Sequence, residues 1–349
     1  MTTPAAAWRM PAEWTDHERT WMAWPSAGYT LGDSQQEADT ARRTWAAVAR
    51  AVAAFEPVSV LVLEKDLPIA RTHLGLDTAH PIDLVTAPLD DAWMRDMGPS
   101  FVLGDGGRLG AVDWVFNGWG AQSWASWDHD RAVGALVADS AGAQLIESPL
   151  VNEGGGFQVD GQGTALLTET VQLDPARNPG LTKQDVELEL ARTLGVSTCI
   201  WLPRGLTRDY QEFGTRGHVD IVATFASPGV VLLHWQDDPA HPDYPVCREL
   251  AGLLAEARDA TGQQLEVVRV PAPRTVADQD GFVDWSYINH LVVNGGVVAC
   301  TFTDPQDTAS LEILAQAYAG RAVTGVDARP LFDRGGGIHC ITQQQPVAR

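Results

Sequence analysis

Cysteines are scarce in this chain, and long apolar runs are missing. Four cysteines among 349 residues, Cys199, Cys247, Cys300 and Cys340, are too few for a disulfide framework in a chain of this length. No run approaches the roughly 20 apolar residues of a membrane-spanning helix, and the N-terminus has no basic segment followed by an apolar stretch of signal-peptide length. We therefore expect a cytoplasmic protein that does not bind membranes.

Basic residues are also few. The chain has 24 lysines and arginines against 45 aspartates and glutamates, which gives a formal net charge of −21. Phosphate binding requires a basic surface, so nucleic acid is excluded as a partner. The acidic excess mildly favours a cationic ligand, although solubility alone explains many acidic surfaces. The oligomeric state stays open, with a homo-oligomer among the options.

One cysteine stands in an unusual setting near the C-terminus. The run Gly335-Gly336-Gly337-Ile338-His339-Cys340-Ile341 places Cys340 after a triple-glycine turn, where the backbone can approach a ligand closely. The isoleucines on either side suit a short buried strand that would hold the thiol rigidly. Cys340 is therefore our candidate nucleophile, although most lone cysteines are buried structural thiols.

Three further motifs combine ionisable groups with glycines or aromatics in loop-like settings. They are Asp91–Pro99, Asn152–Gly156 and Gly217–Asp220. A His-x-Asp pair alone is usually a structural histidine. Together with a reactive cysteine, however, these motifs supply a nucleophile, an acid/base histidine, a carboxylate to orient it and two spare carboxylates.

Two spare carboxylates beside a thiolate indicate a guanidinium substrate. This planar cation presents paired N–H donors along its edges, which carboxylates accept in bidentate fashion. A cysteine acyl-transferase needs the opposite environment, because its tetrahedral intermediate carries negative charge that requires N–H donors.

The four motifs, in this order and at these intervals, resemble the agmatine deiminase and bacterial-type peptidyl-arginine deiminase family of the guanidine-modifying superfamily. The resemblance covers nearly the whole chain. It extends to Met10–Trp14 with His17-Glu18, to Val112–Gly120, and to Ser286–Asn289 followed by Val293–Gly296. The C-terminal Gly-Gly-Gly-Ile-His-Cys-Ile-Thr-Gln-Gln-Gln-Pro run is the most specific of these signals.

Hydrophobic periodicity predicts an α/β protein. Helices are expected near 35–55, 129–141, 182–194, 244–259 and 306–319, with Thr182 and Asp185 at the start of the third and Gly195 at its end. Strands are expected near 58–63, 100–103, 165–168, 230–234, 265–270 and 297–299. The resemblance implies a five-bladed β/α propeller (pentein) with pseudo-fivefold repetition, formed by a single catalytic domain over residues 1–349. From the sequence alone, a two-domain α/β protein competes with it.

The resemblance also assigns the catalytic roles. Asp96 and Asp220 would hold the guanidinium nitrogens, and the Cys340 thiolate would attack the central carbon. His218 would protonate departing ammonia and then, oriented by Glu153, activate the water that releases a ureido product. Either charged His218 or the bound guanidinium would generate the thiolate. No cofactor and no metal are implied.

The substrate is expected to be a small cationic guanidine. Agmatine, converted to N-carbamoylputrescine in putrescine biosynthesis, is the default, and Trp93 and Trp119 are candidates to stack on its guanidinium plane. Family members typically carry Asp-Glu-Thr-Asn before Gly-His-x-Asp, but here the stretch is Phe-Gly-Thr-Arg, ending at Arg216. Side chains alternate along a strand, so Arg216 is predicted to share the channel face with His218 unless Gly217 breaks the extended geometry. That would favour a carboxylate-bearing guanidine such as arginine, a guanidino acid or peptidyl-arginine.

Three rival functions remain. Arginase-type metallohydrolases also act on guanidines, and histidines and aspartates do occur in 127–130 and 236–243. Neither stretch has a second cluster in strand context to complete a dinuclear centre, and Asp130 is more typical of a helix start. A related amidinotransferase and a non-catalytic binding module are the other two. The module is disfavoured because all five ionisable roles are filled.

Overall fold

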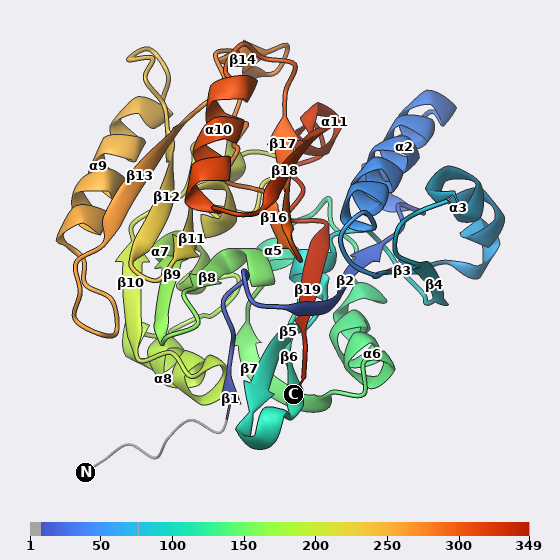
Figure 1. The fold of residues 1–349 in the computed structure, drawn as a ribbon, viewed down its shortest axis with the longest axis horizontal. Coiled ribbons are helices and arrows are strands. Elements are labelled where there is room, and N and C mark those ends of the chain that lie inside the picture. The colour runs from blue at the N-terminus through green and yellow to red at the C-terminus, as the bar shows by residue number, and fades with distance from the viewer. Residues whose placement is uncertain (1–7, 76, 349) are drawn as a thin grey trace.

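The computed structural model describes residues 8–75 and 77–348, which form a mixed α/β structure (Figure 1). Within this part of the chain, five sheets of three or four strands repeat one pattern. A central strand pairs antiparallel on one side and parallel on the other, and the parallel pair is connected through a helix. Parallel neighbours require such a crossover, which explains why each sheet carries its own helix.

The first four repeats follow one another along the chain. The first repeat consists of β5 (Ser100–Gly104), β6 (Leu109–Val115), α6 (Val133–Ser140) and β7 (Gln144–Val151), and the second of β8 (Phe157–Val159), β9 (Thr164–Thr168), α8 (Lys183–Leu194) and β10 (Thr198–Leu202). The third consists of β11 (Ala223–Ser227), β12 (Val230–Trp235), α9 (Asp243–Glu256) and β13 (Glu266–Pro271). The fourth consists of β16 (Leu291–Val293), β17 (Gly296–Thr301), α10 (Asp307–Ala317) and β18 (Ala322–Asp327).

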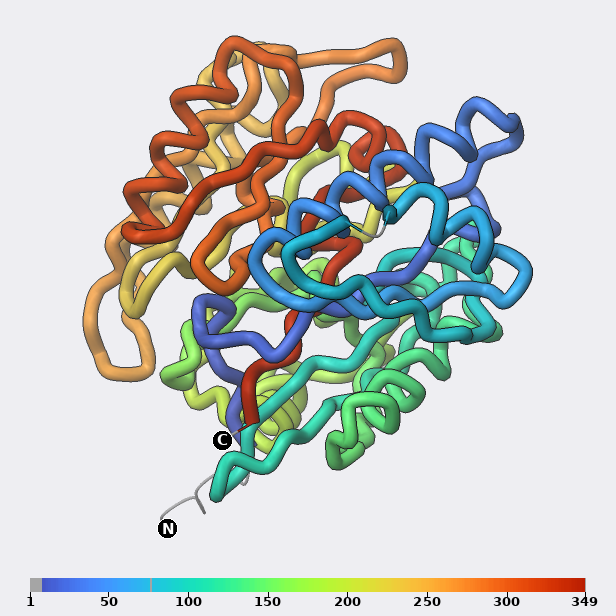
Figure 2. Tube along the Cα trace, turned by 45° about the vertical axis from the view of Figure 1, so that its right-hand side comes forward, coloured from blue at the N-terminus to red at the C-terminus, as the bar shows by residue number. Residues whose placement is uncertain are grey.

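The fifth repeat is assembled from both ends of the chain. Strand β19 (Thr342–Pro346) pairs antiparallel with β2 (His17–Ala23), and helix α2 (Gln35–Val52) leads to the parallel strand β3 (Val58–Val62). Helix α3 (Leu67–Leu74) then leads to β4 (Ile82–Thr86) at the edge. Figure 2 shows the C-terminal strand running beside the N-terminal segment. Because β19 is paired with β2, the turn that directly precedes β19 is held in place at its C-terminal end.

Five sheets, each with a crossover helix and the fifth with a second one, α3, match the repeat that a β/α propeller requires. Helices α2, α6, α8 and α9 lie around the outside of the strands (Figure 1). The arrangement of all five units around one channel stays a prediction, as does the single domain over 1–349.

Local signals in the sequence account for the ends of several helices. Thr182 accepts a hydrogen bond from the Asp185 backbone in a capping box, and Gly195 ends α8 in the left-handed conformation, both as predicted. Helix α2 begins with a second capping box, formed by Ser34 and Glu37, and ends at Val52, three residues before its predicted end.

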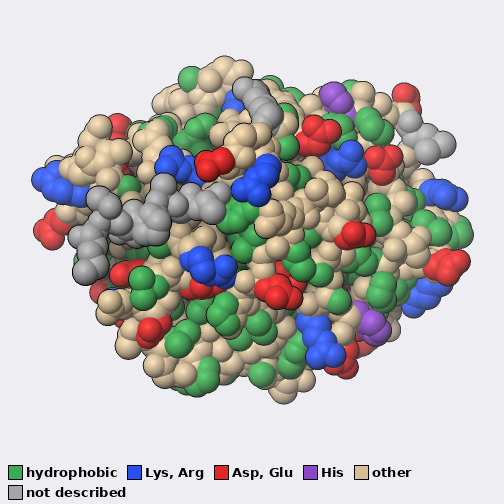
Figure 3. Space-filling model, turned by 90° about the horizontal axis from the view of Figure 1, so that it is seen from below, with side chains coloured by type: hydrophobic (Ala, Val, Ile, Leu, Met, Phe, Trp, Pro, Cys, Tyr) green, Lys and Arg blue, Asp and Glu red, His purple; other side chains and the backbone are tan. Residues whose placement is uncertain are grey.

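The main hydrophobic cluster draws buried side chains from all five sheets, and a second cluster fills the space between the β5–β7 and β8–β10 sheets. Cys300 lies in the first cluster on β17, and Cys199 on β10 packs against the second. On the face shown in Figure 3, acidic and basic side chains are interspersed with apolar ones rather than gathered by sign. No helix in the described ranges is long and apolar enough to cross a membrane.

Candidate active site

The candidate residues lie at equivalent places in the five repeats, in the short turn that precedes the first strand of each sheet. They are Asp96 in α4 (Met94–Met97) before β5, Glu153 beside Gly154–Gly156 before β8, His218 and Asp220 at Val219–Ile221 before β11, Asn289 before β16, and Cys340 before β19. Each sheet therefore contributes one turn to a common site. The five residues predicted as catalytic are all brought together.

Cys340 lies in a turn, so the buried strand predicted to hold it is wrong; β19 begins two residues later. Its Sγ is 3.2 Å from Asn289 Nδ2 and 3.5 Å from Asp220 Oδ2. The turn is anchored by a hydrogen bond from the Arg95 backbone N–H to the Cys340 carbonyl. Burial raises the pKa of the thiol well above its usual range, and the charges of Asp220 and Asp96 raise it further. The thiol is therefore neutral in the free protein.

His218 is held between two carboxylates. Its Nε2 lies 3.3 Å from Glu153 Oε2, while Nδ1 lies 3.8 Å from Asp96 Oδ1 and has no hydrogen-bond partner within the described residues. Burial lowers the pKa of the imidazole, but the charges of Asp96, Glu153 and Asp220 outweigh it and raise the pKa to about 9. His218 is thus a charged proton donor at neutral pH.

Arg177 fixes the carboxylate that contacts His218. Its Nε donates to both oxygens of Glu153, at 3.0 and 3.1 Å, and its terminal nitrogens bind Asp174 and the Thr215 carbonyl. Burial alone would raise the pKa of Glu153, but Arg177 and His218 together lower it. Glu153 therefore stays ionised and holds one orientation.

Asp96 receives one hydrogen bond on each oxygen. Oδ1 accepts from the Gly155 backbone at 3.1 Å, and Oδ2 accepts from the Trp119 indole at 2.8 Å. Burial raises its pKa to about 6, against the opposing charge of His218. Gly155 permits this close packing, because a methyl group there would come within 2.5 Å of His218 Nδ1 and 3.1 Å of Asp220 Oδ2.

Asp220 presents one free oxygen. Its Oδ2 lies 2.8 Å from His339 Nδ1, and His339 Nε2 lies 2.8 Å from Glu13 Oε1. The other oxygen, Oδ1, is buried without a hydrogen-bond partner in the described structure. Burial would raise the pKa of Asp220, but His339 and His218 lower it. The result is an ionised carboxylate with an unused acceptor beside the thiol, the arrangement that a cationic N–H donor would complete.

Trp93 and Trp119 are both buried at the site. A methyl group on Gly336 would lie 2.8 Å from the Trp93 ring and 3.0 Å from Cys340 Sγ, so this ring is a near neighbour of the thiol. Trp119 adopts a left-handed backbone conformation, with φ of 57°, and its N–H binds Asp96. It therefore orients a carboxylate in this conformation, whereas stacking of either ring on a guanidinium stays a prediction.

The backbone at Arg216 contradicts the strand geometry from which its position was predicted. Arg216 has φ of 71° and Gly217 has φ of 113°, so this stretch is not extended and side chains do not alternate along it. The argument that Arg216 must share a face with His218 is therefore wrong. The guanidinium instead pairs with Asp174 Oδ2 at 3.3 Å, with two fifths of the side chain exposed.

Four residues of the site were missed as functional groups. Asn289 and Glu13 lie inside the motifs that carried the family resemblance, and His339 adjoins the candidate nucleophile, so a signal existed for each. Arg177 had none, because only the fold brings it to Glu153. Within the described residues, no group of three or more His, Cys, Asp or Glu side chains is placed to hold a metal ion.

Comparison with known proteins agrees with this geometry. The model of the Porphyromonas-type peptidyl-arginine deiminase family matches residues 9–346. A Streptomyces avermitilis protein named "Putative agmatine deiminase" is 57% identical over 99% of both chains, and the agmatine deiminase of Ectopseudomonas mendocina is 39% identical over 99% of this chain and 98% of that protein. The solved structure of Enterococcus faecalis agmatine deiminase aligns with a TM-score of 0.90 and 32% identity, covering 98% of this chain and 97% of that one. The α/β fold class is thereby confirmed, and the chain belongs to the Porphyromonas-type peptidyl-arginine deiminase family.

Proposed function

We propose that this chain is a cysteine-dependent deiminase that hydrolyses agmatine to N-carbamoylputrescine and ammonia. The observation that carries the proposal is the free oxygen of Asp220, buried and ionised beside Cys340. The printed names of relatives at 39% and 57% identity and of the Enterococcus faecalis structure support agmatine as substrate. The product would then feed putrescine formation. The core shared by all five sheets supports one catalytic domain over 1–349.

Binding is the first step. The guanidinium N–H groups donate to Asp220 Oδ1 and to Asp96, whose carboxylates both face the space beside the Cα of Gly155. Charge-assisted bonds of this kind are about twice as strong as neutral ones. Trp93, next to the sulfur, limits the site to a flat group.

The bound substrate, rather than His218, is the better source of the thiolate. Burial raises the pKa of Cys340, and the carboxylates of Asp220 and Asp96 raise it further; an incoming cation would neutralise the effect of these carboxylates. The charge of His218, in contrast, is already balanced by Asp96 and Glu153. On this proposal, the thiol loses its proton to solvent as the cation binds, and thiolate forms only when a guanidinium is in place.

The chemistry then proceeds in two stages. The Cys340 sulfur bonds to the guanidinium carbon, and the C–N bond to one terminal nitrogen breaks as His218 donates a proton and ammonia leaves. Neutral His218, oriented by Glu153, next takes a proton from water, whose oxygen bonds to the same carbon. The C–S bond breaks, giving the ureido product and returning the thiol.

A second candidate substrate is a carboxylate-bearing guanidine. The observation that favours it is the charged Arg216, which stands where relatives typically carry asparagine and remains partly exposed. The pairing of Arg216 with Asp174 weakens this candidate, since that carboxylate already balances its charge.

Ammonia release from agmatine, arginine, 4-guanidinobutyrate and an arginine-terminated peptide tests the proposal. Agmatine should be turned over fastest, and Cys340→Ser should abolish turnover while leaving the fold intact, because a serine hydroxyl is not ionised at neutral pH. Urea plus an amine as products would indicate an arginase-type reaction. A requirement for an amine acceptor would indicate amidino transfer, and no turnover with any guanidine would indicate a binding module.

A further inference from the structure

The reacting groups are closed off from solvent. Cys340 is 5% exposed, Asp96 3%, and His218 and Asp220 1% each. A substrate that is larger than water can reach them only if some part of the surrounding wall moves. The route to the sulfur therefore passes through the side chains that separate it from solvent.

Three half-buried aromatic rings form a layer outside the site. Tyr29 and Phe213 are stacked, with centroids 4.8 Å apart and planes 7° apart. Trp124 meets both rings edge-on, at 4.7 Å from Tyr29 and 5.4 Å from Phe213. Each ring contacts the other two, and they come from three separate segments of the chain.

This aromatic layer lies directly over the buried tryptophans. Tyr29 is stacked against Trp93 at 6.5 Å, and Trp124 is stacked against Trp119 at 5.2 Å. Trp93 adjoins the thiol, and the N–H of Trp119 binds the carboxylate of Asp96. One further ring therefore separates Tyr29 and Trp124 from a reacting group, and Phe213 packs on both of these outer rings.

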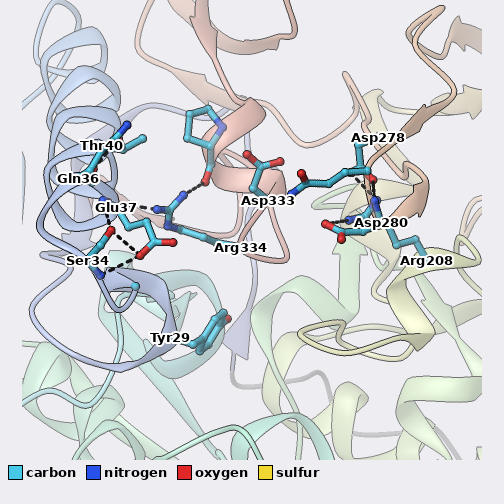
Figure 4. A pocket seen from close by; sticks show the side chains of 13 residues that line it. Tyr29, Ser34, Gln36, Glu37, Thr40, Arg208, Asp278, Asp280, Asp333 and Arg334 are labelled. Atoms are coloured by element: carbon cyan, nitrogen blue, oxygen red, sulfur yellow. Dashed lines mark hydrogen bonds and ion pairs between the residues drawn. The ribbon is translucent and has the colours of Figure 1, made fainter.

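Tyr29, one ring of this layer, also lines a cavity of about 820 Å³. Tyr29 lies at one end of it, apart from the charged side chains that line the rest (Figure 4). Arg334, also in the lining, is followed by Gly335, where a methyl group would come within 2.3 Å of the Phe213 carbonyl. The chain thus runs from the cavity lining at Arg334, past Phe213 at Gly335, to the neighbourhood of Trp93 and Cys340 at Gly336.

We propose that Tyr29, Trp124 and Phe213 form a closed aromatic gate that admits slim guanidines and excludes bulky ones. The inference rests on the proposed function for the identity of the substrate. Aromatic faces attract a guanidinium or ammonium group, so a linear cation is favoured as the rings part. A peptidyl-arginine carries backbone on both sides of its α-carbon and needs a wider opening. Phe213, which contacts both other rings and lies against Gly335 through its carbonyl, is the specificity-determining member.

The segments that carry the gate can move independently of the sheets. Tyr29 is in the single turn α1 (Gly28–Leu31), which has a positive-φ glycine at its first position and at its C-cap. Phe213 itself has φ of 65° in the irregular stretch before Gly217. Displacement of either ring breaks the stack without breaking a strand ladder.

The test measures access to Cys340 in the absence of turnover. Labelling of Cys340 is followed by mass spectrometry with iodoacetamide and with a bulky maleimide at one pH. The ratio of the two rates cancels the thiolate fraction, so it reports on steric access alone. Phe213→Ala should raise the maleimide-to-iodoacetamide ratio by about two- to tenfold, as expected when one stacked aromatic pair is lost.

Trp201→Ala is the matched control, because Trp201 is a half-buried aromatic on β10, bound to Glu187 and outside the gate. It should leave the ratio unchanged. Tyr29→Leu repeats the comparison from the other side of the stack with little loss of apolar volume. If Phe213→Ala or Tyr29→Leu retains its fold and its labelling ratio is unchanged, the proposed gate is refuted.

Selectivity supplies the second measurement. Phe213→Ala should raise kcat/KM for an N-acylated arginine amide relative to agmatine by about tenfold. If the wild-type protein releases no ammonia from any guanidine, the proposed function fails while the labelling ratio still decides the gate. If turnover occurs and the labelling ratio does not change, the gate fails and the proposed function stands.

Discussion

Replacement of Arg177 by methionine should show how strongly the ion pair behind His218 supports the fold. Arg177 is fully buried, and all of its contacts are to Glu153, Asp174 and the Thr215 carbonyl. Removal of one partner of a buried pair typically costs about 3–5 kcal/mol, because the other charge is left uncompensated. His218 remains 3.3 Å from Glu153 and offsets part of this cost, so we expect a loss of about 3 kcal/mol.

Urea unfolding at constant slope measures this loss, and the chain offers a matched control. Arg192 also binds both oxygens of a glutamate, Glu189, but half of its side chain is exposed. Arg192→Met should therefore cost less than about 1 kcal/mol. Similar losses in the two variants would refute the reasoning, because burial is the main feature that separates them.

Acidification should shrink the effect of Arg177→Met. Burial raises the pKa of Glu153, but Arg177 and His218 lower it, so the folded pKa lies below the unfolded one. In the wild type, the stabilising contribution of ionised Glu153 is therefore present above the unfolded pKa and is lost as pH falls through the folded pKa. In the variant, burial is no longer opposed by Arg177, and protonation of Glu153 relieves its cost. The stability difference should thus be largest at neutral pH and smallest in acid.

The geometry of the site carries three further predictions. Gly155→Ala should abolish ammonia release while the circular dichroism spectrum is unchanged, because the added methyl group meets His218 Nδ1 at 2.5 Å; near-normal turnover would show that the turn can give way. His339→Gln should raise KM for agmatine more than it lowers kcat, because Asp220 loses the partner that keeps it ionised and oriented, whereas an effect on kcat alone would place His339 in the chemical steps. Arg216→Asn should change the kcat/KM ratio of agmatine to 4-guanidinobutyrate by less than about threefold, since Asp174 already balances its charge; a tenfold rise would show that the guanidinium reaches the substrate.

Much of the local structure could be predicted because its causes are local. The ends of α8 depend on a threonine, an aspartate and a glycine within or beside the helix, and they were located correctly. The apolar run at 297–299 predicted a strand for the same reason, and it lies within β17. Cys340 was placed on a strand by two isoleucines, but the strand begins at Thr342, because β19 starts where pairing with β2 becomes available.

The sequence by itself determined which chemical groups were present and indicated that they belong together: a thiol, a histidine and three carboxylates in glycine-rich motifs. Only the tertiary structure decided how they are used. It brought Arg177 to Glu153 and His339 with Glu13 to Asp220, and it left one oxygen of Asp220 without a partner among the described residues. Ionisation depends on burial and on charges within a few ångströms, and these distances arise from contacts between segments far apart in the chain. Hydrophobic periodicity does not predict the burial of an ionisable group or the charges that lie near it. It also does not predict the positive φ that turned Arg216 away from its predicted position.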